Sequence, residues 1–82
     1  MKALTLFSTA GCHLCEDAVL ILQYCKQYEP AIEWQIVDIA NDPALVERYG
    51  IRIPVVRSEQ NGEELGWPFD AGQLMDFFKK QL

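Results

Sequence analysis

The sequence predicts an α/β protein with a mixed four-stranded sheet covered by three helices, in the order β-α-β-α-β-β-α. Two strand-then-helix units come first along the chain, and such units join parallel strands through right-handed crossovers. The pair Asn61-Gly62 is a strong signal of a tight hairpin and adds two antiparallel strands. The chain has 82 residues, the size of one small domain, and no linker divides residues 1–82.

The first unit covers residues 2–28. Residues 2–7 form a near-continuous apolar run, as expected of a strand buried on both faces, and residues 8–11 form a small polar loop. From His13 to about Tyr28 the apolar residues recur at helical spacing, and Pro30 ends the helix. The predicted apolar side consists of Leu14, Ala18, Ile21, Leu22 and Cys25.

The second unit covers residues 32–50. Apolar and polar residues alternate from residue 32 and predict a strand that continues to residue 39. Asp42 and Pro43 predict a helix start, with aspartate as the N-cap and proline in the first helical position. This short helix ends at Tyr49, and Gly50 suits the C′ position after it.

The last third of the chain contains a strand, a hairpin and a helix. Residues 51–56 are strand-like, with Pro54 near the start, and residues 60–63 turn the chain back. Asp70 is the expected N-cap of the final helix. The apolar stripe of that helix consists of Leu74, Phe77 and Phe78.

Composition and charge exclude several function classes. Half of the residues are hydrophobic, which suits a globular core. The net charge of −5 has the wrong sign for holding phosphate backbones, so we expect no nucleic-acid partner. No apolar stretch approaches the ~18 residues of a membrane span, and the N-terminal run lacks a secretory cleavage site. We therefore expect a cytoplasmic monomer that does not bind membranes.

Cys12 and Cys15 form a C-x-x-C pair between the first strand and the first helix. In a reducing compartment such a pair is more often catalytic or metal-binding than structural. Cys12 at the start of the helix would face unpaired N–H groups and the positive end of the helix dipole, which favour the nucleophilic thiolate. Cys15, three residues on, lies within reach for disulfide closure. The spacing predicts a nucleophile at Cys12 and a resolving thiol at Cys15.

Other uses of the pair fit the sequence less well. A haem tether needs histidine directly after the second cysteine, where this chain has Glu16. Tetrahedral zinc needs four ligands and one C-x-x-C supplies two, so a zinc site remains open only between subunits. A structural disulfide would close a very short loop in a reducing compartment.

Three features resemble the glutaredoxin type of thioredoxin fold: the placement of the C-x-x-C, the run VDIANDPALVERYGIRIPVV, and the closing hairpin and helix. The ending ELGWPFDAGQL resembles the small bacterial proteins called glutaredoxin-like. The resemblance implies a thiol–disulfide oxidoreductase that takes part in cell redox homeostasis. Its substrate would be a disulfide-containing protein or a small thiol.

The resemblance also implies further site residues. Pro54 would be the cis-proline that faces the dithiol, and Ile53 before it would offer its N–H and C=O to an extended thiol substrate. His13 either stabilises the thiolate or points into solvent. Trp67 either floors a peptide groove or packs against the sheet, and Asp70 either matches an acidic ligand position or simply caps the helix.

Glutathione recognition is where the sequence departs from the family pattern. Relatives that use glutathione carry a Gly-Gly pair before the last helix, whereas here Gly66 is followed by Trp67, Pro68 and Phe69. Arg52 is the nearest basic residue for the far carboxylate. We therefore expect no tightly bound cofactor, weak glutathione binding, and reduction by a thioredoxin-type or other protein partner more readily than by glutathione.

Two other functions remain open at this stage. Some glutaredoxins bridge an iron–sulfur cluster between subunits through the first cysteine and glutathione, so the chain could be a cluster or metal carrier. It could also be a redox-inactive binding module with a groove rimmed by Trp67 and Phe69. Cys25 is expected in the core, and Asp38 is expected to cap a loop rather than accept the proton of the resolving thiol.

Overall fold

The computed structural model describes residues 3–81 and confirms the predicted order of elements. Lys2, where the first strand was expected to begin, lies outside the described residues. The elements are β1 (Ala3–Ser8), α1 (His13–Tyr28), β2 (Glu33–Asp38), the 3-10 turn η1 (Ile39–Asn41), α2 (Pro43–Tyr49), β3 (Val55–Ser58), β4 (Glu64–Gly66) and α3 (Ala71–Lys80).

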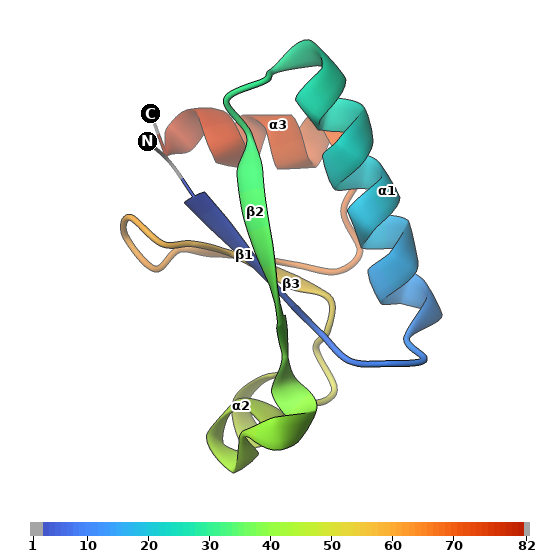
Figure 1. The fold of residues 1–82 in the computed structure, drawn as a ribbon. Coiled ribbons are helices and arrows are strands. Elements are labelled where there is room, and N and C mark those ends of the chain that lie inside the picture. The colour runs from blue at the N-terminus through green and yellow to red at the C-terminus, as the bar shows by residue number, and fades with distance from the viewer. Residues whose placement is uncertain (1–2, 82) are drawn as a thin grey trace.

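The four strands form one mixed sheet in the order β2-β1-β3-β4. β1 pairs in parallel with β2 and antiparallel with β3, and β4 pairs antiparallel with β3 through the Asn61-Gly62 turn. Gly62 has a φ of 78°, the left-handed conformation that such a turn requires. Figure 1 shows α2 at the lower end of β2, away from α3.

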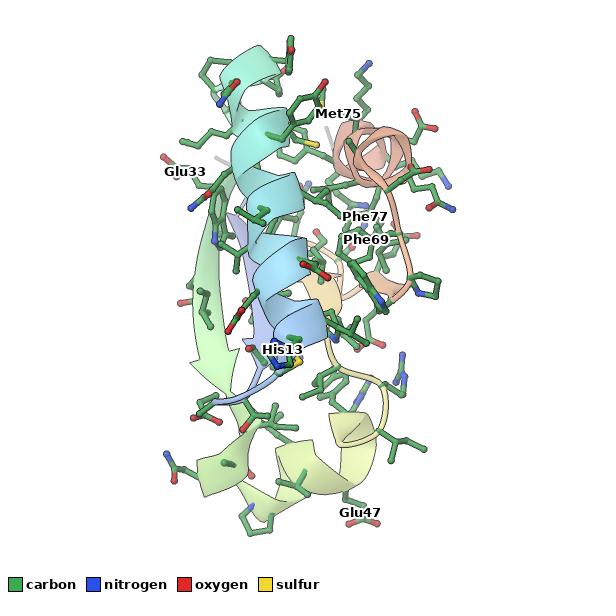
Figure 2. All side chains as sticks on the ribbon, turned by 90° about the vertical axis from the view of Figure 1, so that its right-hand side faces the viewer. His13, Glu33, Glu47, Phe69, Met75 and Phe77 are labelled. Carbon is green, nitrogen blue, oxygen red and sulfur yellow. A yellow bond between two sulfur atoms is a disulfide. The ribbon has the colours of Figure 1, made fainter. Side chains whose placement is uncertain are left out.

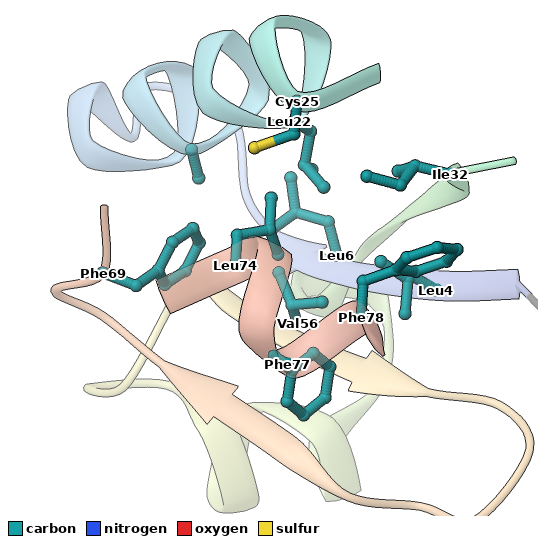
Figure 3. Close-up of a cluster of buried hydrophobic side chains, with 11 residues drawn as sticks. Leu4, Leu6, Leu22, Cys25, Ile32, Val56, Phe69, Leu74, Phe77 and Phe78 are labelled. Carbon is teal, nitrogen blue, oxygen red and sulfur yellow. The ribbon is translucent and has the colours of Figure 1, made fainter. Parts of the chain in front are cut away.

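The main core lies between the sheet and the helices α1 and α3 (Figure 3). Leu4 and Leu6 of β1 and Val56 of β3 point into it and are fully buried. The largest fully buried contributions from the helices and the turn before β2 are Leu22, Ile32, Leu74 and Phe78. Burying a side chain of this kind is worth about 1.5–3 kcal/mol, so this layer supplies most of the hydrophobic stabilisation.

A second, smaller core lies on the other face of the sheet. Phe7 and Val55 point to this face, and the Tyr49 ring of α2 stacks on Phe7 with the ring centroids 4.2 Å apart. Ile39 of η1 completes the cluster. β1 is therefore buried on both faces, as its apolar run predicted.

The segment before β3 differs from the prediction. Ile51 and Arg52 form a turn and residues 53–54 are irregular rather than strand, because pairing with β1 begins at Val55, opposite Phe7. Gly50 is also not a left-handed C′ residue, since its φ is −49°. A Cβ at Gly50 would lie 2.5 Å from the carbonyl oxygen of Val46, so lack of space accounts for the glycine.

The buried stripe of α1 is rotated slightly from the predicted one. Leu14 was expected to face the core but is 47% exposed, and Cys15 is buried in its place. The strand β2 ends at Asp38 rather than at Ile39, because the Asp38 carboxylate accepts a hydrogen bond from the Ala40 N–H and starts η1. Among the helices described within residues 3–81, none has the length and apolar character to cross a membrane.

The capping box of α3 gives a stability prediction. The Asp70 carboxylate accepts from the Gln73 N–H at 2.8 Å, and the Gln73 side chain accepts from the Asp70 N–H at 2.9 Å. Asp70→Ala should lower the free energy of unfolding by about 1 kcal/mol, whereas Asp70→Asn keeps a capping oxygen and should lose only a few tenths. Urea unfolding of the three proteins measures this. Equal losses in both variants would show that the charge of Asp70, and not its cap, matters.

Candidate functional site

The candidate site lies where β1 ends and β3 begins. The loop after β1 turns at Gly11, whose φ of 79° favours glycine, and leads directly to Cys12 at the N-cap of α1. Because Val55 pairs with Phe7, Pro54 comes level with the end of β1. The sheet register therefore brings the dithiol and the Ile53-Pro54 segment to the same edge.

Cys12 and Cys15 are joined in a disulfide, with their Cα atoms 5.2 Å apart. Cys15 is 3% exposed, whereas Cys12 is partly exposed. The Cys12 sulfur also accepts a hydrogen bond from the Cys15 N–H at 3.1 Å and so acts as the N-cap of α1. The Cys12 sulfur thus accepts one of the N–H groups that have no partner within α1, and it lies at the positive end of the helix dipole.

His13 stands out into solvent, with its side chain 94% exposed (Figure 2). Its Nδ1 lies 4.0 Å from a carboxylate oxygen of Glu16 in the first turn of α1. Glu16 and Asp17 are both exposed. Of the two interpretations of His13, the geometry matches the solvent-facing one, and the surroundings of the dithiol on α1 are acidic.

The peptide bond between Ile53 and Pro54 is cis, as the resemblance implied. The Ile53 N–H donates to the Tyr49 carbonyl at 3.0 Å, and the Pro54 carbonyl accepts from the Trp67 N–H at 3.2 Å. The N–H that the resemblance assigns to a substrate therefore already has an acceptor inside the chain. A substrate in the extended pose would have to compete for it.

The residues before α3 lie closer to the core than predicted. Trp67 is partly buried, packs against the main core, and meets Phe69 edge-on with the ring centroids 5.0 Å apart. Phe69 is buried in the core, so the interpretation of Phe69 as a groove rim was wrong. The Trp67-Pro68 peptide bond is a second cis bond that the sequence did not predict. Asp70 acts as a helix cap.

Two residues considered for redox roles have other surroundings. Cys25 is buried between α1 and α3, its sulfur lies 3.5 Å from the Ala71 carbonyl oxygen, and burial raises the pKa of its thiol. The predicted core position of Cys25 is confirmed, and a thiol buried in apolar surroundings is a poor nucleophile. Asp38 is exposed and caps η1, which matches the simpler of its two interpretations.

Sequence reasoning missed a charged cluster around Glu64 of β4. Its carboxylate accepts hydrogen bonds from the Tyr49 hydroxyl and from the Arg52 and Arg48 guanidinium groups. Burial alone would raise the pKa of Glu64, but the bonds from Tyr49 and Arg52 and the charge of Arg48 outweigh it and lower the pKa. Only the register of the hairpin brings Glu64 to α2, so no local pattern could have revealed the cluster.

The described residues offer no ready metal centre. Within residues 3–81, no three side chains of the types His, Cys, Asp and Glu gather closely enough to hold a metal ion. Arg52, considered for a glutathione carboxylate, has its guanidinium 3.2 Å from Glu64 and 5.5 Å from the centroid of the Tyr49 ring. Its positive charge is therefore partly neutralised within the chain.

Comparisons with known proteins agree with the fold. The model of the glutaredoxin-like domain (DUF836) matches residues 3–79. A crystal structure of target protein XcR50 from X. campestris is 40% identical, with a TM-score of 0.83, and the match covers 94% of this chain and 96% of that one. No curated protein matches the chain.

More distant structures share the fold. Protein Ne2328 from Nitrosomonas europaea is 23% identical, with a TM-score of 0.79 and coverage of 93% of this chain and 89% of that one. Thioredoxin O2 from Arabidopsis thaliana in the oxidized state is 16% identical, with a TM-score of 0.67 and coverage of 98% and 74%. These matches confirm the predicted thioredoxin fold.

Glu64 gives a prediction for acid stability. Because its pKa is lowered in the folded chain, its stabilisation is complete above the ordinary glutamate pKa of about 4.3 and is lost as the pH falls through the lower folded value. Unfolding free energies measured in urea from pH 6 to pH 3 should therefore decrease less steeply below pH ~4.3 in Glu64→Gln than in the wild type. The control is Glu47→Gln, on exposed α2 surface, which should follow the wild-type slope. Parallel slopes for all three proteins would contradict the prediction.

Proposed function

The chain belongs to the glutaredoxin-like domain family, and on that premise we propose that it is a thiol–disulfide oxidoreductase with Cys12 as nucleophile and Cys15 as resolving thiol. The observation that carries the proposal is the placement of the Cys12 sulfur at the N-cap of α1, partly exposed, with Cys15 buried behind it. A sulfur in this position is both reachable and biased toward the thiolate.

The proposed reaction transfers two electrons from the dithiol to a substrate disulfide. The Cys12 thiolate attacks one substrate sulfur, which forms a mixed disulfide and releases the other sulfur as a thiolate. Cys15 then loses its proton and attacks the Cys12 sulfur, which closes the Cys12–Cys15 disulfide and releases the second substrate thiolate. Both released thiolates take up a proton, so the substrate is reduced to two thiols and the protein is oxidised.

The buried position of Cys15 supports this division of roles. A resolving thiol has to reach only Cys12, and the Cα separation of 5.2 Å suits disulfide closure without movement of the helix. Cys12 has to meet an external sulfur and is the more exposed of the two. Cys25 is buried in the main core between α1 and α3 and takes no part in the proposed reaction.

A protein dithiol is the proposed reductant of the oxidised form, with glutathione a weak one. Trp67 and Phe69 fill the place before α3 where glutathione-using relatives leave the backbone bare. Arg52 is held by Glu64, and the exposed acids Glu16 and Asp17 stand beside the dithiol and repel an anionic tripeptide. We place this activity in a monomer in the cytoplasm, where a thioredoxin-type donor would supply the electrons.

Cysteine variants test the two roles. Cys12→Ser should abolish disulfide reduction, whereas Cys15→Ser should stop the reaction at the mixed disulfide, which mass spectrometry detects. After reduction, iodoacetamide near neutral pH should label Cys12 well before Cys15. Cys25→Ala is the matched control and should leave the labelling order unchanged. Faster labelling of Cys15 would reverse the assigned roles.

The reductant is tested by turnover on a neutral disulfide, bis(2-hydroxyethyl) disulfide. Loss of one charge-assisted contact costs about 1.5–3 kcal/mol, so turnover with glutathione and its reductase should be roughly ten- to hundredfold below that with a thioredoxin system. Glu16→Gln combined with Asp17→Asn should raise the glutathione rate, and added salt should do the same in the wild type. Equal turnover with both reductants would refute weak glutathione use.

A further inference from the structure

Three side chains from α2 and the segment after it converge on one carboxylate of β4. Glu64 is 16% exposed and accepts from the Tyr49 hydroxyl, from Arg52 Nη2 at 3.2 Å and from Arg48 Nη2 at 3.5 Å. Both guanidinium groups also lie over the Tyr49 ring, 5.4 and 5.5 Å from its centroid. The carboxylate therefore joins β4 to α2 on the face of the sheet opposite α1 and α3.

Tyr49 links Glu64 to the segment that contains the cis-proline through backbone hydrogen bonds. Its backbone carbonyl accepts the N–H of Arg52 at 2.7 Å and the N–H of Ile53 at 3.0 Å. The Tyr49 side chain is fully buried and stacked on Phe7, so the carbonyl has a fixed position. Glu64 thus holds Tyr49 and Arg52 through their side chains, while Tyr49 holds Ile53 through the backbone.

The same strand holds Pro54 from the other side. Gly66 of β4 pairs with Val55, and the Trp67 N–H donates to the Pro54 carbonyl at 3.2 Å. The Ile53-Pro54 unit is therefore held by Tyr49 at one end and by Trp67 at the other. Glu64 bonds to Tyr49 and lies on β4, the strand that leads to Trp67. Pro54 itself is buried, so its position depends on these neighbours.

We propose that Glu64 is a positioning residue for the dithiol reaction. Its carboxylate fixes the Ile53-Pro54 unit at the edge of the sheet where Cys12 lies, so that a substrate binds with its disulfide in line with the Cys12 sulfur. Glu64 acts through Tyr49 and Arg52 and does not touch the reacting atoms. The inference rests on the proposed function, because the reaction that Glu64 serves is the proposed one.

The buried hydrogen bond with Tyr49 is the strongest part of this cluster. The Arg48 and Arg52 side chains are 64% and 46% exposed, and ion pairs exposed to that extent contribute little. Tyr49 is fully buried, and both burial and its bond to Glu64 raise the pKa of its hydroxyl, which keeps the proton that it donates. Loss of the Glu64 charge weakens a charge-assisted bond to a tyrosine side chain that is fully buried.

Three variants test the inference. Glu64→Gln removes the charge and keeps the shape, and Tyr49→Phe keeps the stack on Phe7 but removes the hydroxyl. Glu63→Gln is the matched control, since its carboxylate accepts from the Gln81 and Asn61 side chains and has no bond to Tyr49 or to the Ile53-Pro54 segment. The measurements are amide hydrogen exchange, reduction of insulin with dithiothreitol as the electron donor, and the reduction potential of the dithiol.

Glu64→Gln and Tyr49→Phe should speed exchange of the Ile53 and Trp67 amides at least tenfold more than exchange of the β1 amides, which should rise only by the small factor that the lost stability accounts for. For insulin, kcat/KM should fall about tenfold, mainly through a higher KM, and the reduction potential should not change. Glu63→Gln should match the wild type in all three measurements. This pattern separates positioning from a general loss of stability, which would speed exchange throughout the sheet.

Wild-type exchange and wild-type KM in both variants would overturn the inference, and so would an equal rise of exchange in β1 and at Ile53. If the wild-type protein does not reduce insulin at all, the proposed function fails. The exchange measurement then still decides whether Glu64 fixes the Ile53-Pro54 unit, because it does not depend on turnover.

Discussion

β1 pairs with β2 in parallel and with β3 in the opposite direction, and the site depends on both pairings. The antiparallel register sets Val55 opposite Phe7, which fixes where the Ile53-Pro54 segment meets the end of the strand. The loop after Ser8 then has only Thr9, Ala10 and Gly11 in which to reach Cys12. A slip of one residue in the register would exchange the two faces of the strand and separate these parts.

The two faces of β1 pack into different cores, and each core supports a different part of the site. Leu4 and Leu6 pack under α1, which carries the dithiol, while Phe7 packs on the Tyr49 ring and so orders the segment with the cis-proline. Each half of the site is therefore supported by its own core. Both cores pack against β1, which keeps their relative position fixed.

Features that depend on neighbouring residues could be predicted from the sequence, whereas contacts between distant segments could not. The helix starts at Asp42-Pro43 and Asp70, the hairpin at Asn61-Gly62 and the C-x-x-C at a helix start each depend on a few neighbouring residues, and the structure has all of them. The burial of Cys15 rather than Leu14 depends on how α1 sits on the sheet. The Glu64 cluster and the bond from Ile53 to Tyr49 need contacts that no short pattern encodes.

The sulfur of Cys12 is at once the proposed reactive atom and the acceptor that begins α1. A substitution at this position therefore affects both the proposed reaction and the start of α1. Replacing Cys12 by serine removes the thiol but keeps an oxygen that caps a helix well. Replacing it by alanine removes both the thiol and the cap. The serine substitution therefore removes the thiol chemistry at a smaller cost to α1 than the alanine substitution.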